Sequence, residues 1–170
     1  MVIDNLLEHI ESWAPPGVAW DRDNVGLLVG SGGKEIRNVF LCLELNGQAL
    51  TEALKKNCNL IFTHHPLIFN PIKKLNPHKD STAALIEKLI KNDVALYSAH
   101  TNLDYTKEGV SFALADKLAL ENVKFLNHFD ENQFKLVVYV PVNWRDKVAE
   151  AVFNAGGGII GEYSYCSYRI

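Results

Sequence analysis

The sequence predicts an α/β fold, with a parallel-rich sheet and flanking helices. Three short apolar runs of strand type occur at residues 39–43, 60–62 and 94–97. Each run is separated from the next by a segment whose apolar residues recur at helical spacing. Because two strands joined by one helix run parallel with a right-handed crossover, we expect the three runs to lie side by side in one sheet.

Composition and charge fit an ordinary globular protein. The chain has 170 residues, of which 48% are hydrophobic and 22% are charged, and this length is enough for a real core. The formal net charge of -3 lacks the basic character of a nucleic-acid binder, so nucleic acid is not an expected partner. These values fit one domain, or one domain with part of a second.

The cysteines and the N-terminal residues bear on the compartment. The three cysteines are widely spaced and form no CxxC pair, so neither a disulfide framework nor a zinc ribbon is expected. The N-terminal residues lack the basic and apolar regions of a signal peptide. No run reaches the roughly 18 apolar residues that a membrane span needs. We therefore expect a cytoplasmic protein without membrane contact.

Four helices and a further strand are expected in residues 1–130. The first helix covers residues 3–12 and ends before Pro15-Pro16-Gly17. A short strand at residues 26–29 follows it, and Asp80 or Ser81 can cap the third helix. The apolar positions of the four helix faces are Ile3, Leu6, Leu7 and Ile10; Ala49, Leu50, Ala53 and Leu54; Leu85, Ile86, Leu89 and Ile90; and Val110, Leu114 and Leu118.

The tail has a different pattern and predicts a second, partial module at residues 131–170. Phe134 to Val140 is strongly strand-like, and a helix face with Val148, Val152 and Phe153 follows. The boundary is expected near Asn127 to Asn132. A strand at the edge of a half-module exposes unpaired backbone groups, so we expect self-association through residues 134–140.

Two polar clusters stand at the ends of predicted strands. His64-His65 follows residues 60–62, and His100 and Asp104 follow residues 94–97. Ligands bind beyond the carboxyl ends of the strands in open α/β sheets, so these side chains are expected to converge. Imidazole and carboxylate together suit zinc, iron or manganese. The alternative for any single histidine is an ordinary hydrogen-bonded loop residue, and His9, His78 and His128 are assigned to that class.

The adjacency of His64 and His65 indicates that the strand has already ended there. Neighbouring side chains of a regular strand point to opposite faces, so one site could not use both. Pro66 directs His65 towards extended geometry, and the chain turns at this point. Two adjacent rings could then bind two different metal ions, with Asp104 as the nearest candidate for a bridging carboxylate.

Two other patterns do not indicate function. Residues 156–161 match G-x-G-x-x-G literally, but a helix precedes them where a dinucleotide loop needs a strand. Cys166 lies in a tail rich in Tyr and Ser, where no partner base can be assigned, so it is interpreted as an unreactive thiol.

Three ordered motifs resemble the NIF-three-like family, known as GTP cyclohydrolase 1 type 2 homologues. These motifs are Asp23–Gly30, Thr63–Phe69 and Tyr97–Asp104. Further matches follow at Gly109-Val110, at residues 135–141 and at residues 161–167, so the resemblance covers nearly the whole chain.

The resemblance implies a NIF-three-like duplicated α/β fold with an inserted ferredoxin-like α+β module, a dinuclear metal site and a toroidal homohexamer. It carries metal-ligand roles onto His64, His65 and Asp104, and it places His100 close by, in contact with the ligands. It assigns no catalytic residue. A complete site in the family holds two divalent ions, and this chain is expected to hold two or fewer.

The resemblance also implies that long members continue past the last motif into a second α/β half, which supplies a further histidine and a glutamate. This chain ends inside the inserted module, so it is expected to be an N-terminal part. Three hypotheses follow: a metal-dependent hydrolase of unknown substrate, a non-catalytic protein for metal binding, metal delivery or scaffolding, and a truncated member with an incomplete site.

Overall fold

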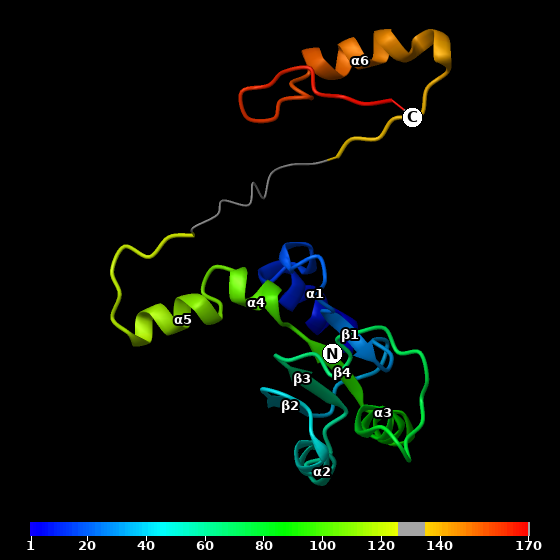
Figure 1. Ribbon diagram of the computed structural model, residues 1–170, viewed down its shortest axis with the longest axis vertical. Coiled ribbons are helices and arrows are strands. Elements are labelled where there is room, and N and C mark those ends of the chain that lie inside the picture. Colours follow the sequence, from blue (N-terminus) through cyan, green and yellow to red (C-terminus); the bar gives the residue numbers. More distant parts are fainter. Residues whose placement is uncertain (126–134, 170) are drawn as a thin grey trace. The chain divides into compact units, whose positions relative to one another are not determined.

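A computed structural model describes residues 1–125 and 135–169, and the predicted boundary at 127–132 lies outside them. The chain separates into two compact units, Met1–Phe129 and Asp130–Ile170 (Figure 1). The helices of the first unit are α1 (Ile3–Trp13), the 3-10 helix η1 (Pro16–Val18), α2 (Gly47–Lys55), α3 (Ser81–Lys91), α4 (Thr101–Tyr105) and α5 (Val110–Lys117). Its strands are β1 (Gly26–Val29), β2 (Val39–Cys42), β3 (Leu60–Thr63) and β4 (Ala95–Ser98). The second unit holds the 3-10 helix η2 (Val142–Trp144) and α6 (Arg145–Asn154).

The four strands form one mostly parallel sheet in the order β1-β4-β3-β2. The neighbours β2 and β3 are parallel, as are β3 and β4, which confirms the predicted crossover units. Strand β1 runs antiparallel to β4, with Gly26 opposite Ser98. The start of β1 therefore lies at the same edge of the sheet as the ends of the other three strands.

Both faces of the sheet are covered, and the alternation along each strand decides which residue packs on which face. Ile61 and Leu96 belong to an apolar cluster with residues of α2 and α3. Leu60 and Tyr97, one position away, belong to a second cluster with residues of α1. Because successive side chains of a strand point to opposite sides, both strands contribute to two cores. In Figure 1 the sheet lies between α1 and the pair α2 and α3.

Side-chain caps fix the start of two helices. The Asn46 carboxamide accepts hydrogen bonds from the amides of Gln48 and Ala49 and caps α2. The Asp80 carboxylate caps α3 in the same way, which decides between the two predicted caps in its favour. The predicted apolar face of α3 is wrong at one position, because Ile90 is 62% exposed while Ala83, Ile86 and Leu89 are buried.

Glycine is required where β1 passes β4. Gly30 has a φ of 101°, and a Cβ built on it would lie 2.8 Å from the Cα of Ala95. Any other residue would meet both backbone strain and a steric clash with the central strand. The glycine after β1 therefore allows the close approach that seats β1 against β4.

Two predicted features differ from the structure. Residues 135–140 form no strand, while Phe134 lies outside the described residues. Their side chains are largely exposed, including Tyr139 at 94%, and an isolated extended segment without a partner strand gains no ladder. The predicted self-association through residues 134–140 needs a second chain and stays a prediction. In α5, Val110, Leu114 and the following Leu118 are exposed, and only Ala115 is buried, so the predicted apolar face has no cover in the described part of the chain.

The second unit has a small set of contacts of its own. The rings of Phe153, on α6, and Tyr165 meet edge to face with centroids 5.1 Å apart. The Arg169 guanidinium donates a hydrogen bond to the Asp146 carboxylate at 2.8 Å. The helix α6 confirms the helical pattern of the tail. Across the described residues of both units, no helix is long and apolar enough to cross a membrane.

The buried phenol of Tyr97 predicts alkaline sensitivity. Tyr97 is fully buried, and its hydroxyl donates to the Glu11 carboxylate at 3.3 Å. Burial first, and then the charge and hydrogen bond of Glu11, raise the pKa of this phenol well above its ordinary value of 10.0. The unfolded chain therefore loses this proton at lower pH than the folded chain. Stability from Tyr97 is present below about pH 10 and declines as pH rises towards the folded pKa, by at most about 1.4 kcal/mol per pH unit.

We expect Tyr97→Phe to remove this decline. Urea unfolding between about pH 9 and 11.5 should show a smaller loss of unfolding free energy in the variant than in the wild type. Tyr139→Phe, at a phenol that is 94% exposed, is the matched control and should follow the wild type. Equal slopes for Tyr97→Phe and wild type would contradict the assignment.

Candidate metal centre

All four strands place polar side chains at one edge of the sheet. Glu44 follows β2, His64-His65 follows β3, and His100 follows β4. Asp23 precedes β1, which begins at this edge because it is antiparallel. The rule that ligands bind beyond the carboxyl ends of parallel strands therefore accounts for the position of the whole group.

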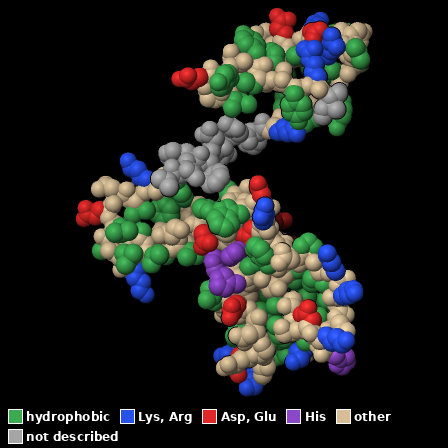
Figure 2. All heavy atoms as spheres, in the orientation of Figure 1, with side chains coloured by type: hydrophobic (Ala, Val, Ile, Leu, Met, Phe, Trp, Pro, Cys, Tyr) green, Lys and Arg blue, Asp and Glu red, His purple; other side chains and the backbone are tan. Residues whose placement is uncertain are grey.

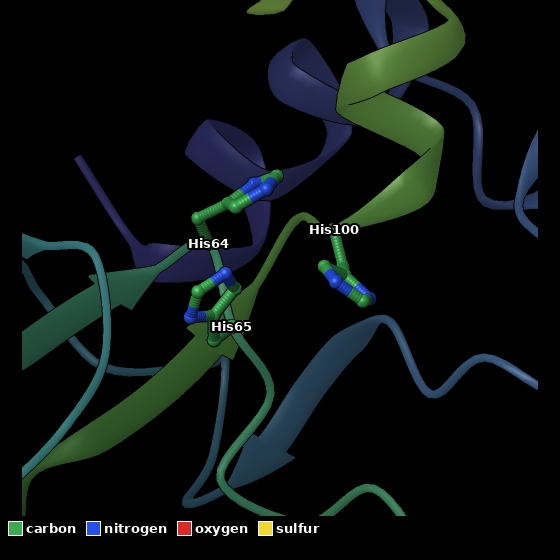
Figure 3. A group of neighbouring side chains, drawn as sticks. All are labelled: His64, His65 and His100. Atoms are coloured by element: carbon green, nitrogen blue, oxygen red, sulfur yellow. The ribbon is translucent and has the colours of Figure 1, made fainter.

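Three histidines form a cluster that could hold a metal ion. One ligand nitrogen from each of His64, His65 and His100 lies within 4.8 Å of the others. The ring centroids of His64 are 5.2 Å from those of His65 and of His100, and those of His65 and His100 are 5.8 Å apart. Figure 3 shows the three rings at the ends of their strands, and Figure 2 shows histidine side chains gathered at the surface beside acidic ones.

The end of β3 explains how two adjacent histidines share one cluster. The strand ends at Thr63, and the chain bends at the next two residues. The carbonyl oxygen of Leu43 accepts hydrogen bonds from both the His64 amide, at 3.1 Å, and the His65 amide, at 2.8 Å. Two successive amides that share one acceptor cannot continue the ladder. The turn therefore brings both rings to the same edge.

Hydrogen bonding fixes the tautomer of His64. Its Nδ1 lies 2.9 Å from the carbonyl oxygen of Ala99, which can only accept, so Nδ1 carries the proton. The lone pair is then on Nε2, which is 3.6 Å from Oδ1 of Asp104. A ring nitrogen and a carboxylate oxygen at this separation can bind the same ion after small rotations.

His65 has a carboxylate partner of its own. Its Nδ1 is 3.7 Å from Oε2 of Glu44. Glu44 is exposed and follows β2 directly after Leu43, whose carbonyl oxygen accepts from both histidine amides. A second imidazole–carboxylate pair therefore stands beside the pair of His64 and Asp104.

His100 is held by Asp23. Its Nδ1 lies 2.9 and 3.0 Å from the two carboxylate oxygens of Asp23, which is almost completely buried. The amide and hydroxyl of Thr101 also donate to this carboxylate, as does the amide of Asn24. The ring of Phe69 meets His100 at 6.5 Å between centroids.

The hydrogen bonds keep Asp23 ionised. Burial on its own would raise the pKa of this carboxyl. The bonds from the Thr101 hydroxyl, His100 and the amides of Thr101 and Asn24 outweigh burial, so the pKa lies below its ordinary value of 3.8. A carboxylate that stays charged in the interior is a strong acceptor for the His100 ring.

The donor set fits a divalent transition metal. Three imidazoles, each with a carboxylate next to it, suit zinc, iron or manganese. A spread of 4.8 Å between nitrogens is wide enough for one ion after small ring rotations or for two neighbouring ions. The four residues singled out from the sequence, His64, His65, His100 and Asp104, lie together, with Asp104 next to His64.

Sequence reasoning missed two carboxylates of the site and set three histidines aside. Glu44 follows a predicted strand and could have been found by the strand-end rule. Asp23 precedes a strand whose direction the sequence did not reveal, so no signal linked it to His100. His9 and His78 are exposed and stand outside the cluster, and His128 lies outside the described residues.

Comparisons with known proteins agree on one family. Residues 1–165 match the model of the family Duf34/NIF3 (NGG1p interacting factor 3). The GTP cyclohydrolase 1 type 2 homologs of Halalkalibacterium halodurans and Bacillus subtilis are 39% and 38% identical to this chain. Each alignment covers 96% of this chain and 44% of the relative.

A solved structure leads to the same family. The Bacillus cereus protein related to NIF3 superposes with a TM-score of 0.70 at 35% identity, over 99% of this chain and 46% of that one. The chain spans less than half the length of the curated relatives it matches. The family model and the relatives together show that this chain belongs to the Duf34/NIF3 family.

Proposed function

We propose that the chain is a divalent-metal-binding protein whose ligands include His64, His65 and Asp104, with His100 beside them. The observation that carries the proposal is the convergence of three imidazole nitrogens within 4.8 Å. The carbonyl oxygen of Ala99 holds Nδ1 of His64, which leaves Nε2 of this ring for a metal. Zinc, iron and manganese are the metals to test, at up to two ions per chain.

For the reaction class we propose metal-dependent hydrolysis. A bound divalent ion would supply Lewis acidity, which lowers the pKa of water and polarises a substrate oxygen. His64 and His65 would hold the ion, and Asp104, beside Nε2 of His64, would be placed to share it. Ala99 holds the proton on Nδ1 of His64, and Asp23 holds that on Nδ1 of His100, so both rings keep one orientation. The name of the relatives makes GTP the first substrate to try.

The test is hydrolysis of GTP by the chain loaded with zinc, iron or manganese. We expect metal-dependent turnover that disappears in Asp104→Asn and in the double variant His64→Ala/His65→Ala. His78→Ala, at an exposed histidine outside the cluster, should retain it. Turnover that survives the double variant would refute the hydrolase proposal.

A non-catalytic role in metal delivery or scaffolding is the second candidate. It is favoured by the state of the carboxylates at the site. Asp104 and Glu44 lie next to imidazole nitrogens, where a bound metal would occupy them, and Asp23 is held by its donors, so each described carboxylate at the cluster is placed to hold a ring or a metal. Metal transfer from this chain to an apo acceptor, without turnover of GTP, would establish this role.

Self-association is also proposed, with the homohexamer that the family resemblance implies as its expected form. The exposed side chains of Val110, Leu114 and Leu118 support it, because apolar groups of this size favour burial. Light scattering at increasing concentration tests it, and a mass that stays at one chain would refute it. A cytoplasmic location remains a prediction from the cysteine pattern.

A further inference from the structure

Asp23 is the most enclosed acidic group at the candidate metal centre. Its side chain is 1% exposed, while that of His100, its partner, is 23% exposed. A buried charge is costly unless donors surround it, so a carboxylate in this position needs a set of hydrogen bonds. Asp23 has that set, and most of its donors come from the turn that carries His100.

The hydrogen bonds of Asp23 converge from two segments. The donors are Nδ1 of His100 at 2.9 and 3.0 Å, the Thr101 amide at 3.1 Å, the Thr101 hydroxyl, and the Asn24 amide at 2.8 Å. The carboxylate therefore ties the segment before β1 to the segment after β4, 77 residues later. The Asp23 carboxylate therefore fixes both the ring of His100 and the backbone at Thr101.

A second buried side chain fixes the backbone of His100. The His100 amide donates to Oδ1 of Asn102 at 2.9 Å, and the Asn102 carboxamide donates to the carbonyl oxygen of Ala14 at 2.8 Å. Asn102 is fully buried. Hydrogen bonds therefore fix both the backbone of His100 and the Nδ1 atom of its ring.

An ionised carboxylate also decides the tautomer. It can only accept, so the shared proton is on Nδ1 of His100 and the lone pair is on Nε2. A histidine in this state has the arrangement found in metal sites, where the outer nitrogen donates to a carboxylate and the inner one binds. His64 has the same arrangement with the Ala99 carbonyl. Two of the three rings in the cluster therefore carry the proton on Nδ1 and the lone pair on Nε2.

We propose that Asp23 is a positioning residue that makes His100 a third imidazole ligand of the metal site. This inference rests on the proposed metal-binding function. It changes the role expected for His100, from a neighbour of the ligands to a ligand, because its ring stands as close to His64 as His65 does, at 5.2 Å between centroids (Figure 3). Asp23 itself does not bind the metal, since its oxygens are occupied by other donors.

A purely structural role for Asp23 makes a different prediction. In that case the carboxylate only joins the segment before β1 to the start of α4, and its loss lowers stability without changing the ring of His100. The tautomer of His100 separates the two roles, because replacing Asp23 changes it only if the carboxylate holds the proton on Nδ1.

The test titrates Co²⁺ into the full chain and records affinity and visible absorption, whose intensity reports the number of ligands. Asp23→Asn and His100→Ala are each expected to weaken Co²⁺ binding by about 10- to 100-fold and to change the absorption band. Asp116→Asn, the matched control at an exposed aspartate, should bind within about threefold of wild type.

Nitrogen NMR of the metal-free protein gives a readout that does not depend on metal. Wild type should show His100 with its proton on Nδ1. Asp23→Asn should shift the population towards the Nε2 proton, because an amide group can donate to Nδ1. A wild-type His100 protonated on Nε2 would overturn the inference, even if Asp23→Asn fails to fold.

The outcomes separate the inference from the function on which it rests. If His64→Ala/His65→Ala abolishes Co²⁺ binding while Asp23→Asn and His100→Ala bind as wild type does, the role of Asp23 is refuted and the metal site stands. If wild type binds no Co²⁺, both fail. Parallel losses in Asp23→Asn and His100→Ala, with the tautomer change, support the inference.

Discussion

Replacing His64 and His65 together with alanine should remove tight binding of divalent metal. The two rings supply two of the three nitrogens that lie within 4.8 Å of one another, and His100 alone cannot hold an ion in place. Loss of an outer partner of a metal ligand typically costs about 10- to 100-fold in affinity, so loss of two direct ligands should cost more. Isothermal titration with Zn²⁺ or Mn²⁺ measures the effect.

The double variant should fold, because neither ring is part of the core. The one described hydrogen bond that a His64 or His65 side chain gives to the backbone is that of Nδ1 of His64 to Ala99, worth about 1 kcal/mol. His9→Ala/His78→Ala is the matched control, since both residues are exposed and outside the cluster. Unchanged affinity in the first variant, or equal losses in both, would contradict the site.

The largest effect on stability is expected for Leu96→Ala. Leu96 is fully buried at the centre of β4, between β1 and β3, and belongs to the cluster packed by α2 and α3. Removing its side chain loses burial and leaves a cavity in a position where strands on both sides limit collapse. The expected cost is about 2 to 5 kcal/mol of unfolding free energy.

Urea unfolding followed by circular dichroism measures this cost. Leu41→Ala is the matched control, because Leu41 lies on the outer strand β2 and is 72% exposed. Its cost should stay within about 0.5 kcal/mol. A similar small change for both variants would show that β4 is not the centre of the core.

Sequence patterns were sufficient for the parallel part of the sheet and for its helices. Apolar runs and helical spacing show which side chains are buried. When both faces of a strand are covered, the strand's own residues are enough to predict that burial. The sequence did not reveal the direction of β1, because the pattern of Gly26–Val29 is compatible with a parallel or an antiparallel strand. That direction decides the site, because it brings Asp23 to the edge where His100 lies.

Two predictions from the sequence lacked the same information, namely which segment pairs with or covers the predicted element. Residues 135–140 are rich in strand-forming side chains, yet the described part of the second unit has no strand to pair with them. Val110, Leu114 and Leu118 have helical spacing and form α5 with its last turn, but the spacing does not say what covers the face. The helical spacing was therefore right about α5, whereas the strand pattern at residues 135–140 predicted an element that the structure does not contain.

The strand-end rule predicted part of the candidate site. The part that it missed depends on contacts between segments that are far apart in the sequence. His64, His65, His100 and Asp104 follow two strands that the sequence places side by side. The shared carbonyl of Leu43, which turns both adjacent histidines to one edge, could not be read from the sequence. Asp23 is 77 residues from His100 and joins it through the fold alone.

Metal content combined with anomalous scattering tests the central claim most directly. Crystals of the chain grown with Zn²⁺ or Mn²⁺ should show an anomalous peak at the cluster. Nitrogens of His64, His65 and His100 should then lie about 2.0 to 2.2 Å from the ion. Elemental analysis of the same protein should give at least one ion per chain. A metal-free chain, or a peak away from these histidines, would contradict the account.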